Sequence, residues 1–225
     1  MNFLSHYYFD KTKTNPLEIV GMLLPDLIRN ADKSWNLHPE KLTAPVFGSQ
    51  SQQAIMLGWQ RHLKVDRVFH SSMFFRYHQH QLKLCIRESL NGTPIKPFFV
   101  GHIGIELLLD SLLITQNKVN VNDFYRHLAK VDLDEIRRFL KLNHIHDVEK
   151  FCSYYQRFLA EKYIYTYADV NQISHAIKNI CKRIWPFTLS AQQEEAITLG
   201  LQDYKKTLSE SFMVIFDEID AQINR

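Results

Sequence analysis

Glycine and proline are scarce in this sequence, with only 7 residues of each among 225. Because these two residues supply many of the tight turns that β proteins need, their scarcity argues against a turn-dense all-β fold. Cysteine is scarcer still: Cys85, Cys152 and Cys181 are an odd number at wide spacing. The cysteines therefore indicate neither a disulfide framework nor a cysteine-based zinc site, and a reducing cytoplasm is the expected setting.

The chain also lacks a strong charge imbalance, a signal peptide and a long uninterrupted apolar run. Its net charge of +3 is too small to predict a nucleic-acid partner by itself. Residues 1–9 have no charged n-region, and the longest apolar run is shorter than a membrane span and is interrupted by ionisable residues. We therefore expect a cytoplasmic protein with no nucleic-acid or membrane partner, and the sequence leaves its oligomeric state open.

Helical periodicity is what the sequence does contain. Apolar residues recur at helical spacing along most of the chain, and 225 residues suffice for one sizeable core. We predict an all-α fold, a single-domain helical bundle over 1–225, in which 1–115 carry the motifs and 116–225 supply packing helices. One long helical pattern covers 51–90, and a capping box at Ser190–Gln193 opens a last helix that reaches Ile219.

Three ionisable residues interrupt the most apolar stretch of the chain. His102, Glu106 and Asp110 follow one another at intervals of four, so a helix would place all three on one face. The residues around them are nearly all apolar, which indicates a buried helix. A buried carboxylate is costly unless it is paired or bound to a metal, so this stretch predicts a cationic partner.

A second triplet with the same spacing lies about forty residues upstream. It consists of His62, Asp66 and His70. Two helices that face each other with these triplets would offer three imidazoles and three carboxylates to one volume. Such a set suits Mn, Fe, Zn or Ni better than Ca or Mg, because imidazole is present. The alternative is two amphipathic helices whose polar stripes face water.

Four other polar residues lie outside the two triplets. Asp26 is either a turn carboxylate beside Pro25 or a further metal ligand. We expect His6, among aromatic residues, to be a hydrogen-bonded core residue. His78 and His80 are two positions apart and do not share a helix face, so we expect both at the surface.

Four short motifs occur together in an order typical of one family: Met1–His6, Gly21–Asp26, His62–Asp66 and Ile105–Asp110. With them the chain resembles the bacterial acyl carrier protein phosphodiesterases, a divergent branch of the HD-type metal phosphohydrolases. The resemblance covers roughly residues 1–115. It implies an HD-like helical fold and Mn-dependent removal of the 4′-phosphopantetheine arm from acyl carrier protein.

The resemblance carries over residue by residue, with departures. The positions that match the family's polar residues are His6, Asp26, His62, Asp66, Glu106 and Asp110. Leu63 stands where the family has arginine, His70 and Glu106 where it has aspartate, and Ser111 where it has histidine. His102 is an addition. The departures keep a ligand-rich site but change its composition.

Together, pattern and resemblance assign roles to these residues. We expect a divalent metal, Mn foremost and Fe, Zn or Ni as alternatives, with the ligands His62, Asp66, His70, His102, Glu106, Asp110 and Asp26. Asp66, Glu106 and Asp110 are the expected catalytic carboxylates, and His6 is expected to support the ligands from behind.

Nearby basic side chains complete the expected site. Those expected to hold the substrate phosphate are Arg61, Lys64, Arg67 and Arg76, although each could equally belong to a solvated basic face. The expected substrate is acyl carrier protein or a small phosphodiester. The alternative function is a metal-binding helical protein without catalysis.

Overall fold

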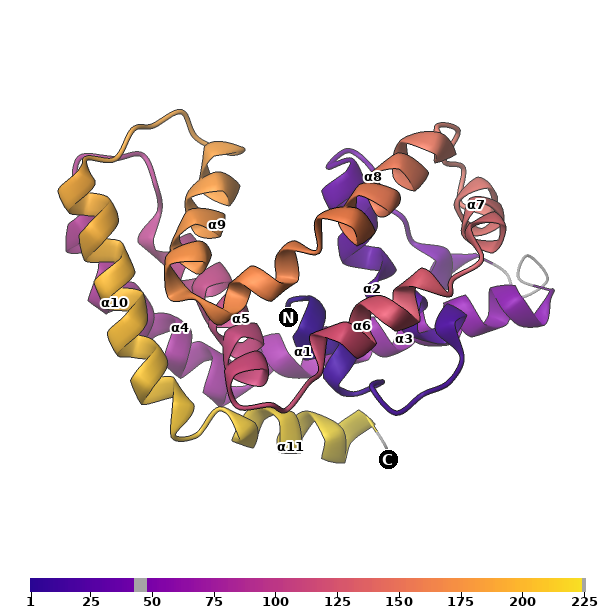
Figure 1. Cartoon of the computed structure of the whole chain (residues 1–225), viewed down its shortest axis with the longest axis horizontal. Helices are drawn as coiled ribbons and strands as arrows, with labels where there is room; N and C mark the ends of the chain where they lie inside the picture. Colours follow the sequence, from indigo (N-terminus) through magenta and orange to yellow (C-terminus); the bar gives the residue numbers. More distant parts are fainter. Residues whose placement is uncertain (43–47, 224–225) are drawn as a thin grey trace. The chain divides into compact units, whose positions relative to one another are not determined.

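A computed structural model describes residues 1–42 and 48–223, and every regular element in them is a helix (Figure 1). The all-α prediction is thereby confirmed, whereas the HD-like arrangement stays a prediction. The chain divides into two compact units. The α5 unit comprises Met1–Ser5, Arg67–Lys118 and Ile164–Arg225, and the α2 unit comprises His6–Asp66 and Val119–Tyr163. Both halves of the sequence contribute to both units, and the single-domain prediction stays a prediction.

The α5 unit is built around α5 (Pro97–Thr115), against which α4 (Met73–Ile86), α9 (Val170–Lys182) and α10 (Ala191–Ser209) pack. The short helix η3 (Glu88–Leu90) contacts α4 and α10. Two further helices of this part of the chain are η4 (Tyr163–Ala168) and α11 (Met213–Ile223). A Cβ atom on Gly101 would lie 2.7 Å from the Gln79 carbonyl oxygen, so glycine allows α5 to approach α4 closely.

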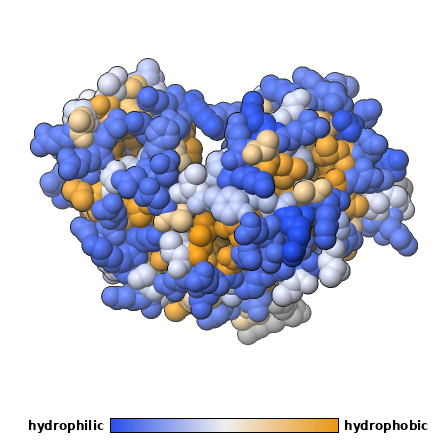
Figure 2. Space-filling view, in the orientation of Figure 1, coloured by the Kyte–Doolittle hydropathy of each residue, from blue (hydrophilic) through white to orange (hydrophobic). Residues whose placement is uncertain are grey.

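The apolar character of α5 is that of a core helix. By length and composition it could cross a membrane, but 61% of its most apolar window is buried inside the structure. Its buried residues include Val100, Leu108 and Leu112. Hydrophilic side chains cover most of the face seen in Figure 2.

The α2 unit packs α2 (Pro16–Ala31) against α6 (Val121–Ala129) and α8 (Val148–Glu161), with α7 (Leu133–Leu142) on α8. A 3₁₀ turn, η1, covers Pro39–Lys41. Gly21 of α2 and Gly58 of α3 (Gln50–Ser71) meet where the two backbones touch: a Cβ on Gly21 would lie 2.3 Å from the Ile55 carbonyl oxygen. Only glycine fits this crossing.

Several helix boundaries differ from the sequence prediction. The predicted helix over 51–90 is two helices, because Ser72 ends α3 and caps α4: its Oγ accepts a hydrogen bond from the Phe75 amide at 3.0 Å. The predicted last helix is also two, since α10 ends at Ser209 and α11 begins at Met213. The capping box at Ser190 and Gln193 is confirmed.

The surroundings of Asp26 and of His78 differ from the prediction. Pro25 and Asp26 lie inside α2 and not in a turn, because the helix continues through the proline to Ala31. His78 is buried and not at the surface, since α10 packs on α4 and brings the Tyr204 hydroxyl to 2.7 Å from His78 Nδ1.

Candidate metal centres

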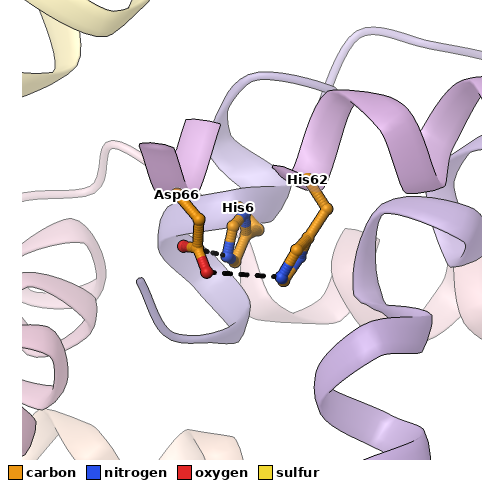
Figure 3. Close-up of side chains that lie close together, drawn as sticks. All are labelled: His6, His62 and Asp66. Atoms are coloured by element: carbon orange, nitrogen blue, oxygen red, sulfur yellow. Dashed lines mark ion pairs between the residues drawn. The ribbon is translucent and has the colours of Figure 1, made fainter. Parts of the chain in front are cut away.

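The first group of possible metal ligands lies in the α2 unit and consists of His6, His62 and Asp66. His6 comes from α1 (Phe3–Tyr8), and the other two lie one turn apart on α3 (Figure 3). His6 Nε2 is 3.2 Å from Asp66 Oδ1, and His62 Nε2 is 3.5 Å from Asp66 Oδ2. The two imidazole rings are stacked, with centroids 3.9 Å apart. We call these three residues the buried triad.

The orientation of His62 is fixed by a backbone carbonyl. Its Nδ1 lies 2.8 Å from the carbonyl oxygen of Met22, which can only accept a hydrogen bond. Nδ1 therefore carries a ring proton, and Nε2 is the nitrogen that faces Asp66. Metal-bound histidines commonly have this arrangement, in which one nitrogen donates to a carbonyl and the other is the ligand.

Burial and neighbouring charges shift the pKa values of the three members of the buried triad in different directions. Burial, together with the neighbouring His62, lowers the pKa of His6 to about 3, so His6 is neutral at physiological pH. Burial alone would raise the pKa of Asp66, but His6 and His62 lower it below its ordinary range. For His62, burial lowers the pKa, but Asp66 and Asp26 raise it more and leave it above its ordinary value.

His6 has an incomplete set of contacts. Its side chain is fully buried, and within the described part of the chain neither ring nitrogen has a partner with good hydrogen-bond geometry. Buried polar atoms are normally satisfied, so an unsatisfied imidazole nitrogen beside a carboxylate calls for an explanation. Two atoms bound tetrahedrally to one ion at about 2.1 Å lie roughly 3.4 Å apart. The separations of 3.2 and 3.5 Å between the two imidazoles and the Asp66 carboxylate are close to this value.

The second group lies in the α5 unit and consists of His70, His102 and Glu106. His70 Nε2 is 3.7 Å and His102 Nε2 is 3.3 Å from the same oxygen, Glu106 Oε1. The side chains of His70 and His102 are 34% and 39% exposed, whereas that of Glu106 is 17% exposed. We call these residues the open triad, because solvent reaches both imidazoles.

An aromatic ring supports the open triad. Phe75 of α4 is buried and meets the rings of His70 and His102 nearly at right angles, each with centroids 4.9 Å apart. The two histidine rings are themselves stacked at 5.0 Å. This packing limits the rotation of both imidazoles, so their Nε2 atoms are held on the Glu106 side.

Glu106 is ionised in this setting. Burial alone would raise its pKa, but the Met1 amino group and the imidazoles of His102 and His70 lower it to about 2. The Met1 nitrogen lies 3.5 Å from Glu106 Oε1 and supplies part of the compensating charge. A carboxylate with two imidazoles can hold a divalent cation with coordination positions left for water or substrate.

The structure groups the predicted ligands differently from the sequence. His62 and Asp66 are brought together with His6, and His102 and Glu106 with His70. His6, expected to support the ligands from behind, points its own Nε2 at Asp66 (Figure 3). The position of His6 at the end of the Met1–His6 motif was the sequence feature that could have identified it as a ligand. Asp26 acts on the pKa of His62 but is in neither group of converging ligand atoms within the described residues.

Asp110 is placed as an anchor for the start of α1, which does not fit its predicted metal-binding and catalytic roles. It is fully buried, and its oxygens accept hydrogen bonds from the Asn2 side chain, the Leu4 amide, and the amide and hydroxyl of Ser5, at 2.6–3.0 Å. These four donors occupy both oxygens. Burial raises the pKa of Asp110 to about 6, although the same donors oppose the shift.

The four basic residues predicted to bind substrate divide in two. Arg61 is tied to the buried carboxylate of Asp10, with Nε 2.8 Å from Oδ1, so its guanidinium serves the fold and the substrate role does not suit it. Lys64, Arg67 and Arg76 are exposed. Arg67 precedes His70 by three residues on α3 and therefore shares its face of the helix.

Comparison with known proteins finds no family model, no curated protein and no solved structure that matches this chain. The two triads are therefore interpreted from their own geometry. Each could hold a metal ion.

Proposed function

We propose that this protein is a metal-dependent phosphodiester hydrolase that works at the open triad. The observation that carries the proposal is the convergence of two partly exposed imidazoles on one ionised carboxylate. Catalytic metal sites typically have three protein ligands and an open position, whereas structural sites are closed by protein. By this criterion the buried triad suits an ion that stabilises the fold, and the open triad suits one that reacts.

A divalent cation supplies activation of water and neutralisation of charge on the phosphoryl oxygens. The chain's own residues do the rest. His70, His102 and Glu106 hold the cation, Phe75 keeps both imidazoles in place, and Arg67, one turn from His70, binds a phosphoryl oxygen. Mn²⁺ suits this mixed set of nitrogen and oxygen ligands, as do Fe²⁺, Zn²⁺ and Ni²⁺.

The resemblance of the motifs supports acyl carrier protein as the substrate and the cytoplasm as the location. An acyl carrier protein is acidic, and exposed Lys64, Arg67 and Arg76 would favour its approach. A small phosphodiester is the alternative substrate. The second candidate function is metal binding without catalysis, which the closed surroundings of the buried triad favour.

The experiment is a Mn²⁺-dependent hydrolysis assay on bis(4-nitrophenyl) phosphate and on holo acyl carrier protein. Glu106→Gln keeps the size of the side chain and removes its charge, so we expect turnover and bound metal to fall together. The matched control is Glu88→Gln, whose side chain is 82% exposed on η3. If the wild-type protein binds Mn, Fe, Co, Ni or Zn yet hydrolyses neither substrate, the hydrolase proposal is rejected in favour of metal binding without catalysis.

A substrate-binding variant separates the two roles. Arg67→Ala should raise KM roughly three- to tenfold and leave the metal content unchanged, because Arg67 contacts the substrate and not the ion. Arg87→Ala, at a site 57% exposed, is the control. A loss of metal in Arg67→Ala would contradict the assigned role.

A further inference from the structure

The α5 unit contains a cavity of about 430 Å³ that neither triad uses. It lies between α9 and α10, and Val100 of α5, Leu90 and Ile95 also line it. Its size is within the range of small-molecule sites, which is roughly 300–1,000 Å³. In Figure 2 orange atoms are visible among and beneath the blue side chains over α9 and α10.

Apolar side chains form the inner wall. Each of them is at most 5% exposed: Leu90, Ile95, Val100, Ile177, Cys181 and Ile197. They come from η3, the following turn, α5, α9 and α10, so the wall is assembled by the packing of the whole unit. Such a wall favours the aliphatic or aromatic part of a ligand, because its contact removes apolar surface from water.

Two polar bridges join α9 to α10 along the cavity. Thr198 Oγ1 donates to Ser174 Oγ at 2.8 Å, and Lys178 Nζ donates to both carboxylate oxygens of Glu194 at 2.9 Å. The Gln193 side chain also donates to the Asn91 carbonyl oxygen at 3.1 Å and holds the start of α10 against the neighbouring turn. These contacts keep the two helices at a set separation, so the cavity is largely formed before a ligand arrives.

The charges on the lining are unequal. Lys178 is matched by Glu194, whereas Glu195 is exposed and has no ion-pair partner among the described residues. His175 also lines the cavity and is exposed. Counting the charged side chains of the lining, one lysine against two glutamates gives the mouth of the cavity a net negative formal charge. A cationic group is favoured there over an anionic one.

We propose that this cavity binds a small amphiphile with an apolar body and a cationic head, such as an alkylammonium. The apolar body lies against the inner wall, and the ammonium group lies beside Glu195. The site is separate from the open triad, since Val100 and His102 are two residues apart on α5 and point to opposite sides of it. The proposal does not depend on hydrolysis or on a metal.

The test uses N-phenyl-1-naphthylamine as a fluorescent apolar probe of the full chain, with octylammonium and octanoate as competitors. We expect saturable binding of one probe per chain, unchanged by EDTA, and stronger displacement by octylammonium than by octanoate. Absence of saturable binding overturns the site, and equal or stronger displacement by octanoate overturns the preference for a cationic head.

Three variants locate the ligand. Ile177→Phe fills the inner wall and Ser174→Trp blocks the mouth, so each should weaken probe binding about tenfold or more. Ile184→Phe, on a residue 47% exposed beyond the end of α9, is the matched control. Unchanged probe binding in both variants, with helical circular dichroism retained, overturns the proposal.

Glu195→Gln tests the charge on an exposed side chain and needs no change in the core. It should weaken octylammonium binding roughly two- to fivefold, as exposed ion pairs do, and leave the neutral probe unaffected. Glu161→Gln, at the exposed end of α8, is its control. Equal octylammonium affinity in Glu195→Gln and wild type overturns the role of Glu195.

Discussion

At the scale of single residues, each triad combines two imidazoles with one carboxylate. The two triads differ in how far their side chains are buried. His6 is completely buried and His62 nearly so, whereas both histidines of the open triad are about one-third exposed. Exchange of ions and access of substrate depend on this difference. The two groups should therefore be separable by single substitutions.

Metal stoichiometry provides that separation. His6→Asn and His102→Asn should each lower bound metal by one equivalent, because each removes one of only three ligands from its own group. Elemental analysis of the purified, Mn-loaded protein makes the measurement. The control is His38→Asn, whose side chain is 46% exposed. A variant that retains the full wild-type metal content would show that its histidine is not a ligand.

The pH dependence of the free energy of unfolding should report the protonation of Asp110. Its pKa is raised from an ordinary 3.8 to about 6 by burial, so the folded state holds a proton that the unfolded state has released. Between about pH 4 and pH 6 the native state binds more protons, and this contribution to stability falls as the pH rises, by roughly 2–3 kcal/mol in total.

The measurement is the free energy of unfolding of wild type and Asp110→Asn across this pH range. Asp110→Asn is expected to be less stable at every pH, since an amide group cannot accept from all four donors. The difference between the two curves should shrink as the pH rises from 4 to 6. A constant difference would show that Asp110 stays ionised.

At the scale of helices, the contact of α2 with α3 positions a ligand. Gly58 lies so close to α2 that an added Cβ would be 2.1 Å from the Glu18 carbonyl oxygen. The same crossing holds the Met22 carbonyl against His62. The separation of two backbones thus determines where an imidazole points.

Gly58→Ala should therefore weaken the buried triad without changing any ligand. The methyl group must push α2 away from α3, at a cost of roughly 1–3 kcal/mol in stability, and the bond from His62 to Met22 lengthens. Gly200→Ala is the control, because its Cβ would lie 3.3 Å from the Ile86 side chain and 3.7 Å from the Cys85 carbonyl oxygen, both without a severe clash. Denaturant unfolding and metal titration measure both effects, and wild-type values in Gly58→Ala would contradict the argument.

The element scale also shows how far sequence reasoning reached. Helical periodicity and caps predicted an all-α chain, the capping box at Ser190 and the helical setting of both triplets. Helical periodicity did not predict the break at Ser72, because apolar residues continue at helical spacing on both sides of it. The hydrogen bonds of the Ser72 hydroxyl, to the Phe69 carbonyl and from the Phe75 amide, leave no mark on that spacing. Spacing alone could not reveal that Asp110 would meet the amides of α1, since that contact joins residues 105 positions apart.

At the scale of the whole molecule, bound metal should stabilise the fold. An ion that binds only the native state adds about 3 kcal/mol when its free concentration is a hundredfold above Kd. We therefore expect exhaustive EDTA treatment to lower the melting temperature and Mn²⁺ to restore it. The control is the double variant His6→Asn/His102→Asn, which should not respond. An unchanged melting temperature in wild type would mean that protein groups alone satisfy both triads.

The bonds from Asp110 to the start of α1 have a consequence for the growing chain. The carboxylate that accepts from the amides of α1 follows 105 residues after Ser5, so it leaves the ribosome later than those amides do. At synthesis rates of roughly 5–20 residues per second, that interval is about 5–20 s. During it the opening residues, with Phe3 and Leu4 among them, are an uncapped apolar segment that a chaperone could bind.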